Sequence, residues 1–300
     1  MKHRFLLWAA AAVYALNLCS CASKNCGEHL KWTLDRNGTL TVSGTGDMTD
    51  WGLFCDTVPW ESKISEIQKA VISDGVTHIG NCAFASNTLT AVSIPDSVTS
   101  IGNQAFSGSA LTAVTIPEGV TSIGDSAFYY CTGLTAVTLP DSVTSIGDSA
   151  FYDCFALTSL SIPSGITQIG KDVFAECYRL TEVTIPDSVT DIGESAFQGC
   201  YRLTAVTIPK SVTHIGENAF HGCGTLTAVT IPESVTEIGK GAFSDCINLG
   251  TVTVLNETCS IGGGLDETFS CERIRGCKGS TAEAYAKRFS IAFEALPEKE

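Results

Sequence analysis

The chain has 300 residues, of which 44% are hydrophobic and only 17% are charged. This composition excludes an intrinsically disordered protein, and the length suits an elongated repeat protein better than one ordinary hydrophobic core. The formal net charge of -14 would repel phosphate backbones, so we expect no nucleic-acid partner.

Residues 1–20 have the pattern of a secretory signal peptide. Lys2, His3 and Arg4 form a basic start, and the apolar stretch from Phe5 to Leu18 is too short to cross a bilayer as a mature helix. No later segment reaches the ~18 apolar residues that a membrane span requires. We therefore expect an exported chain that touches the membrane only through an anchor.

The end of this segment carries a second motif. Leu18-Cys19-Ser20-Cys21 resembles a bacterial lipobox, which implies cleavage before Cys21 and lipidation of its thiol. Ser20-Cys21-Ala22 also fits an ordinary small-x-small cleavage site. The first interpretation predicts a lipid-anchored protein at the bacterial cell surface, and the alternative predicts a released extracellular protein.

Residues 21–69 do not repeat and are expected to form an N-terminal β-hairpin cap. Two short runs, 30–34 and 39–42, flank Asn37-Gly38, and Asn-Gly between such runs is a strong hairpin signal. This region also holds three of the four tryptophans, Trp32, Trp51 and Trp60. We interpret them as core filler for the cap, with a carbohydrate-stacking platform as the alternative.

One sequence motif repeats over residues 70–255. A phenylalanine recurs every 22 or 23 residues, at Phe84, Phe106, Phe128, Phe151, Phe174, Phe197, Phe220 and Phe243. The motif reads L-T-x-V-x-I-P-x-x-V-T-x-I-G-x-x-A-F, as in Leu134 to Phe151. It holds two β-branched runs, the first ended by Pro, which lacks an N–H, and the second by Gly, which permits a turn. We expect two short strands per copy, then one short helical or 3-10 turn around Ala-Phe.

This period falls within the range of leucine-rich repeats, whose L-x-x-L-x-L core is present as Leu134, Val137 and Leu139. With Pro directly after the strand and Cys three residues after Phe, the motif resembles the BspA-type leucine-rich repeat of bacterial surface proteins. The resemblance implies a repeat solenoid of about eight to nine coils, which buries its apolar residues in continuous rows. It also points to adhesion, because BspA-like proteins include surface adhesins.

The 14 cysteines of an exported chain would ordinarily suggest disulfide bonds. Six of them follow the repeat instead, at Cys131, Cys154, Cys177, Cys200, Cys223 and Cys246. Stacked coils would give these six parallel side chains, which is poor disulfide geometry, so we interpret this cysteine ladder as core. The pairing of the other cysteines, Cys26, Cys55, Cys82, Cys259, Cys271 and Cys277, stays open, with Cys271 and Cys277 nearest in sequence.

Residues 256–300 are expected to form a helical C-terminal cap. Ser280 and Glu283 resemble a capping box that opens a helix through about Phe289. Phe293 would then supply a last apolar contact with the solenoid.

We expect neither an enzyme nor a site for a cofactor or metal. Catalysis requires different residue types to converge, whereas a repeat places one type along a row. His78 and His214 occupy the same repeat position six coils apart and cannot share a site. The chain contains no G-x-S-x-G, P-loop, H-E-x-x-H or C-x-x-C motif.

Outward-facing threonines form one candidate binding surface. They make two rows along the first run of each copy: Thr112, Thr135, Thr181, Thr204 and Thr227, and beside them Thr115, Thr138, Thr184, Thr207 and Thr230. Threonine favours solvent-facing strands for structural reasons alone, although regular hydroxyls could also engage a repetitive polymer.

The second candidate surface lies between each Phe and the next Leu, where the copies differ most. These positions bracket the cysteine ladder and gather tyrosine and arginine, which proteins favour at interfaces. The candidate partner-binding residues are Tyr129, Tyr130, Tyr152, Phe155, Tyr178, Arg179, Tyr201 and Arg202. Tolerance of variation at loop edges is the alternative explanation.

Together these features predict a non-catalytic extracytoplasmic binding protein. Its expected partner is an extracellular or host protein, bound through the repeat surface in adhesion. A glycan-binding surface module and a purely architectural envelope protein are the alternatives.

Overall fold

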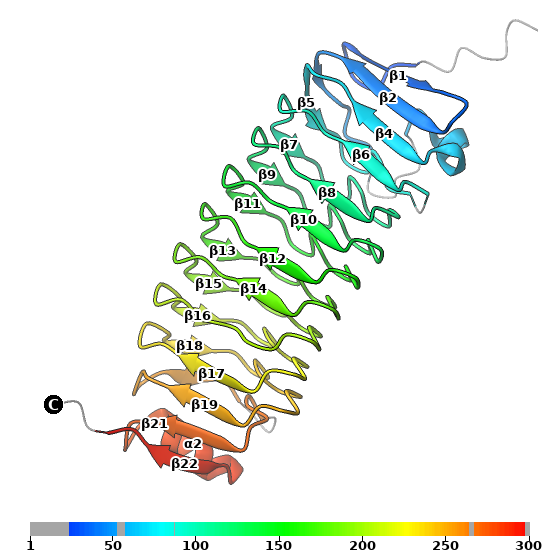
Figure 1. Cartoon of the computed structure of the whole chain (residues 1–300). Coiled ribbons are helices and arrows are strands. Elements are labelled where there is room, and N and C mark those ends of the chain that lie inside the picture. The colour runs from blue at the N-terminus through cyan, green and yellow to red at the C-terminus, as the bar shows by residue number, and fades with distance from the viewer. Residues whose placement is uncertain (1–23, 53–57, 87, 264–266, 298–300) are drawn as a thin grey trace, which may run out of the picture.

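The computed structural model of the chain describes residues 24–52, 58–86, 88–263 and 267–297. Cys21, Cys55 and the predicted signal peptide lie outside these residues. The described residues form one elongated solenoid in which most coils contribute two short strands, so two rows of strands run along the molecule (Figure 1). The predicted repeat solenoid of short strands is therefore confirmed.

The first row contains the L-T-x-V-x-I runs, although the run at 203–208 forms no strand. Its strands are β2 (Thr39–Gly44), β4 (Lys69–Ile72), β6 (Ala91–Ser93), β8 (Ala113–Thr115), β10 (Ala136–Thr138), β12 (Ser159–Ser161), β14 (Glu182–Thr184), β17 (Ala228–Ile231), β19 (Thr251–Val254), β21 (Arg273–Gly276) and β22 (Ala292–Ala295). Neighbouring strands pair in parallel within blocks, such as β8 with β10 and β12 with β14. Val252 and Val254 point inward between the half-exposed Thr251 and Thr253, the alternation expected of a strand with one buried face.

The second row contains the V-T-x-I run. Its strands are β3 (Gly46–Asp47), β5 (Val76–Ile79), β7 (Ser100–Ile101), β9 (Ser122–Ile123), β11 (Ser145–Ile146), β13 (Gln168–Ile169), β15 (Asp191–Ile192), β16 (His214–Ile215), β18 (Glu237–Ile238) and β20 (Ser260–Ile261). They pair in parallel as two five-stranded blocks, β3 to β11 and β13 to β20.

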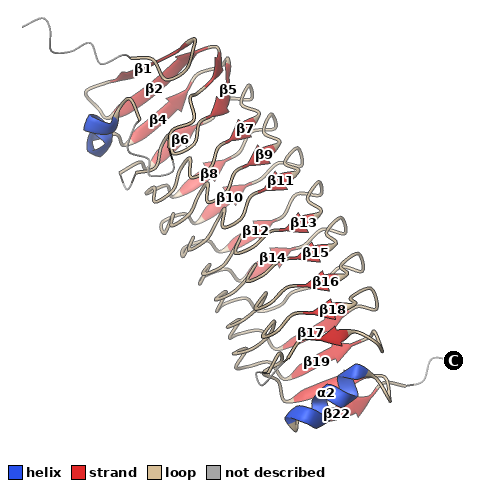
Figure 2. Ribbon diagram, turned by 180° about the vertical axis from the view of Figure 1, so that it is seen from behind, coloured by secondary structure: helices blue, strands red, loops and turns tan. Residues whose placement is uncertain are grey.

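The third side of each coil consists of turns, so the expected helical or 3-10 turn around Ala-Phe is wrong (Figure 2). Residues two before each Phe from Phe84 to Phe243, and two after each from Phe106 to Phe243, are left-handed, as in Ser149 with φ 57° and Asp153 with φ 53°. A right-handed helix cannot continue through such residues. The backbone instead bonds alternately within and between coils: Tyr152 N donates to Ser149 O at 3.0 Å, and Phe151 N to Val173 O at 2.9 Å.

A single column of stacked phenylalanine rings fills the core. From Phe84 to Phe269, successive ring centroids lie 5.1 to 5.8 Å apart. Trp60 continues the column at 5.7 Å from Phe84, and Trp32 and Trp51 pack edge-on against Trp60. Trp32 and Trp51 are only 8% and 9% exposed, so the tryptophans are core filler and the carbohydrate-stacking alternative is wrong.

The cysteine ladder is buried and free of disulfides, as predicted. Each thiol donates to the carbonyl of the Phe in the preceding coil, as Cys177 Sγ does to Phe151 O at 3.3 Å. Burial raises the pKa of these thiols, that of Cys246 to about 12. Elsewhere Cys82 is disulfide-bonded, and the free thiol of Cys271 shows that the Cys271–Cys277 pair does not form.

Both ends of the chain join the same ladder of strands. The hairpin of β1 (Leu30–Leu34) with β2 is present as predicted, and β2 continues in parallel into β4. A 3-10 helix, η1 (Glu61–Glu66), follows in the N-terminal part. At the other end, β21 and β22 extend the first row past residue 255, beginning with the pairing of β21 to β19. The cap boundaries themselves, 21–69 and 256–300, stay predictions.

The predicted C-terminal helix is confirmed as α2 (Thr281–Phe289). Ser280 Oγ accepts from Glu283 N at 3.3 Å, as in a capping box, whereas Glu283 Oε2 accepts from Gly279 N at 2.6 Å, one residue before the N-cap. Tyr285 of this helix packs edge-on against Phe269, the last ring of the core column. Neither helix of the described part is long and apolar enough to cross a bilayer.

Candidate binding surface

The eight candidate residues lie on one edge of the solenoid, where the turn side meets the first row of strands. This set, called the aromatic edge below, comprises Tyr129, Tyr130, Tyr152, Phe155, Tyr178, Arg179, Tyr201 and Arg202. Because each coil repeats the same turn, side chains at equivalent positions come into register along the solenoid. The structure brings them together as two stacked groups.

The first group surrounds Tyr129. Its ring stacks on that of Tyr152 in the next coil, with centroids 5.1 Å apart and planes 11° from parallel. The Tyr130 ring lies 6.0 Å from Tyr129 and is exposed. Tyr130 itself has a left-handed backbone, with φ 60°.

The second group stands directly after three successive ladder cysteines. Tyr178 lies between Phe155, at 5.3 Å, and Tyr201, at 5.1 Å and nearly parallel. The Arg179 guanidinium lies 5.9 Å from the centre of the Phe155 ring, within cation–π range. Phe155 and Tyr201 remain 43% and 50% exposed. Arg202 is also exposed, beside Tyr201.

Two carboxylates stand at the base of these rings. The Tyr178 hydroxyl donates a hydrogen bond to Glu176, which together with burial raises the pKa of Tyr178 to about 12. Burial and the charge of Glu176 in turn raise the pKa of Asp153. Gln198 Nε2 also donates to Glu176 Oε1 at 3.4 Å. Glu176 therefore holds Tyr178 in place, a role that the sequence pattern did not reveal.

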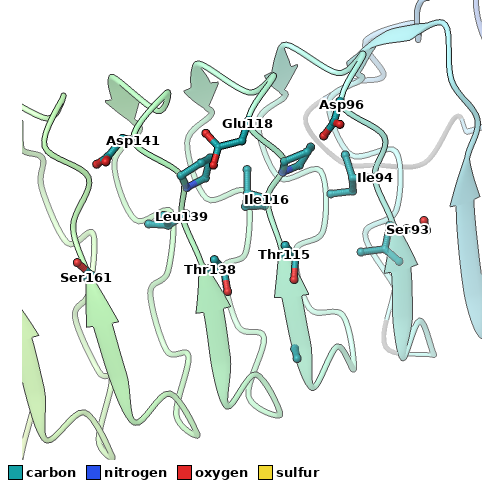
Figure 3. Close-up of a pocket in the computed structure, with 14 residues that line it drawn as sticks. Ser93, Ile94, Asp96, Thr115, Ile116, Glu118, Thr138, Leu139, Asp141 and Ser161 are labelled. Atoms are coloured by element: carbon teal, nitrogen blue, oxygen red, sulfur yellow. The ribbon is translucent and has the colours of Figure 1, made fainter.

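The second candidate surface is a groove along the first row of strands, with a volume of about 840 Å³. Figure 3 shows three rows of side chains along it. The rows are acidic (Asp96, Glu118 and Asp141), apolar (Ile94, Ile116 and Leu139) and hydroxyl-bearing (Ser93, Thr115, Thr138 and Ser161). It lies over β6, β8, β10 and β12, at the ends of the strands farthest from the aromatic edge.

The sequence profile described as the BspA type leucine rich repeat region matches residues 62–181 and 167–278, in six copies. The chain belongs to this family. Membership is consistent with a non-catalytic repeat protein, and comparison with curated proteins finds no match.

Solved structures of bacterial leucine-rich-repeat proteins resemble this fold. The T. pallidum leucine-rich-repeat protein is 24% identical, with a TM-score of 0.50 over 75% of this chain and 90% of that one. A leucine-rich-repeat protein from Eubacterium ventriosum is 22% identical, with a TM-score of 0.46 over 84% and 86%. A leucine-rich cell surface protein from Faecalibacterium prausnitzii is 24% identical, with a TM-score of 0.37 over 92% and 95%.

In this BspA-type solenoid the two predicted threonine rows differ in their bonding. In the row of Thr135 and Thr181, the hydroxyls donate to the carbonyl of the equivalent Thr in the preceding coil, at 2.9 and 3.0 Å. These donors serve the solenoid itself. In the other row, Thr115 and Thr138 line the groove, and the described residues offer them no such partner.

Two histidines make side-chain hydrogen bonds that the repeat pattern did not predict. His78 Nδ1 lies 2.7 Å from Ser100 Oγ in the next coil, and His78 Nε2 lies 3.1 Å from Asp50 Oδ1. Burial alone would raise the pKa of Asp50, but hydrogen bonds from Asn81 N and His78 outweigh it and lower this pKa. His221 likewise lies 2.7 Å from Ser244 of its next coil. The recurrence indicates bonds between coils, and no described cluster of His, Cys, Asp or Glu could hold a metal.

Proposed function

We propose that this BspA-type protein binds an extracellular or host protein through the aromatic edge, as an adhesin outside the cell. Its attachment would be a lipid on Cys21, with release after Ala22 as the alternative, both from the sequence of residues 1–22. The observation that carries the proposal is the column of half-exposed rings in contact, with Tyr178 stacked on Tyr201 and tilted against Phe155.

Apolar rings exposed in this way support protein binding for two reasons. Tyrosine and arginine supply much of the binding energy at protein interfaces, because they bury a large area and also hydrogen-bond. The stacking contacts and the Glu176 hydrogen bond already restrict Tyr178, so binding would order little more. Such preorganisation lowers the entropic cost of association.

The experiment is saturable binding of the mature protein to immobilised extracellular-matrix proteins and to cultured epithelial cells. A variant with Tyr152, Tyr178, Arg179, Tyr201 and Arg202 all changed to Ala should bind at least about tenfold more weakly, because losing two or more anchors costs over ~1.4 kcal/mol. Circular dichroism checks that the variant remains folded.

A matched control changes the groove, at the far ends of the first-row strands. Thr115→Ala together with Thr138→Ala alters the groove, and its binding should stay within about twofold of the unchanged protein. Equal binding by the aromatic-edge variant and the parent would contradict the proposal. Absence of saturable binding by either protein would favour the architectural alternative.

The groove supports a second candidate, a glycan-binding module. Its hydroxyl row at Thr115 and Thr138 repeats along the axis beside carboxylates, and both groups hydrogen-bond sugars. A glycan array separates the two functions. Saturable glycan binding that the Thr115→Ala and Thr138→Ala variant loses, and the aromatic-edge variant keeps, would favour this candidate.

A further inference from the structure

The second column of exposed rings on the aromatic edge stops abruptly. Phe155, Tyr178 and Tyr201 follow the ladder cysteine in three successive coils, and the next two coils have Gly224 and Ile247 at the same position. Along this column three successive coils carry an aromatic ring, the fourth carries no side chain and the fifth carries an aliphatic side chain.

The missing side chain leaves a slot with defined walls. A carbon placed on Gly224 as a side chain would lie 3.7 Å from Cγ1 of Ile247 and 3.9 Å from Cδ1 of Tyr201, so both neighbours border this space. Tyr178 has a ring against it on each side, whereas among the described residues Tyr201 has a ring partner only on the Tyr178 side. Ile247 is 82% exposed, the highest value among the exposed large hydrophobic residues of the described chain.

We propose that this slot, with Gly224 as its floor, receives an aromatic side chain of a partner protein. Two coil spacings of ~4.8 Å separate the Tyr201 and Ile247 positions, and rings on this edge stack at about half that separation. A single inserted ring would therefore contact Tyr201 on one face and Ile247 on the other. Only the identity of the partner as a protein rests on the proposed function.

A planar ring matches the slot better than other ligands do. It continues the stack of Tyr178 and Tyr201 and covers the apolar surface of Ile247, which gains both stacking and burial. The base of a nucleotide is also planar, but the phosphates of the nucleotide would be repelled by a chain with a net charge of -14. A side chain carried by a protein brings the ring without that repulsion.

The test uses full-length mature protein with ¹³C-labelled isoleucine methyl groups and N-acetyl-tryptophanamide as the probe. A ring stacked on Ile247 should move its methyl resonance upfield in a saturable way, with a dissociation constant of about 1 mM or weaker for so small a ligand. Ile247→Val removes this resonance and so identifies it. N-acetyl-leucinamide, which has no ring, should cause no such shift.

The decisive variant fills the slot with an aromatic side chain of the protein itself. Gly224 lacks a left-handed backbone, and a side-chain carbon there meets only ordinary contacts, so Gly224→Phe and Gly224→Ala should both fold. In Gly224→Phe the Ile247 methyl should already lie upfield without the probe, and probe affinity should fall at least about tenfold. Gly224→Ala, the matched control, should keep probe affinity within about threefold.

Several outcomes would overturn the slot. One is the absence of a probe-dependent shift at Ile247, and another is an undiminished shift in Gly224→Phe. A third is an equal shift with adenosine monophosphate, because it would remove the preference for a protein side chain. The proposed function fails separately, through unchanged partner binding by the aromatic-edge variant. A probe shift at Ile247 without any partner binding would therefore contradict the proposed function but not the slot.

Discussion

The repeat places Asp153 in surroundings that disfavour its charged form. It takes the left-handed turn position two residues after Phe151, with φ 53°. Burial and the neighbouring Glu176 both disfavour its charged form and raise its pKa. Because the folded pKa lies above the unfolded one, ionised Asp153 destabilises the fold once the pH exceeds both values. That cost disappears as the pH falls below the unfolded pKa.

Asp153→Asn should therefore raise the melting temperature most at neutral pH. Asparagine keeps the shape and suits a left-handed turn, but it never carries the charge. The gain should shrink as the pH is lowered from about 7 to about 3, where Asp153 is itself protonated. Thermal unfolding followed by circular dichroism at several pH values measures this. Asp187→Asn makes the same charge change at an exposed position and controls for net charge; a gain independent of pH would contradict the argument.

At the scale of the strand, the two threonine rows predict different energetic roles. Thr181, just before β14, donates its hydroxyl to Thr158 O at 3.0 Å, whereas Thr184 at the end of β14 has no side-chain partner in the described structure. Both sites are solvent-facing, where valine suits a strand as well as threonine does. The two substitutions thus differ mainly by one hydrogen bond between coils.

Thr181→Val should lower stability by about 0.5–1 kcal/mol relative to Thr184→Val, the cost of losing one such bond at an exposed site. Urea unfolding midpoints of the two variants give the comparison, each against the parent. Equal midpoints would mean that the hydroxyl ladder adds nothing to the stacking of coils.

The same scale separates what the sequence could predict from what it could not. The β-branched runs, the Pro after the first and the Gly after the second determine both strand rows, because each acts locally. The turn side was mispredicted because Ala-Phe spacing fits a helical turn, while the left-handed residues Ser149 and Asp153 have no unique residue type. The residues of the aromatic edge were predicted from the positions at which the copies differ most and gather tyrosine and arginine. Their stacking order, the Glu176 contact and the slot at Gly224 depend on register between coils, which no single copy encodes.

At the scale of the whole molecule, the phenylalanine column couples each coil to its neighbours. Phe174 is fully buried near the middle, 5.7 Å from Phe151 and 5.5 Å from Phe197. Phe84 is also buried, but it lies near the N-terminal end, next to Trp60. Since a solenoid coil contacts mainly the coils beside it, stability is close to a sum of nearest-neighbour interfaces. The same deletion should therefore have different consequences at the two sites.

Phe174→Ala should cost about 3–5 kcal/mol locally and uncouple the two halves of the solenoid, because its cavity breaks the column in the middle. Phe84→Ala removes the same ring but should destabilise mainly the coils before Phe106. Hydrogen exchange read by mass spectrometry distinguishes them: faster exchange on both sides of residue 174 in the first variant, and only towards the N-terminus in the second. Uniformly faster exchange along the chain in both variants would instead mean that the solenoid unfolds as one cooperative unit, with coupling that outweighs the loss of a central ring.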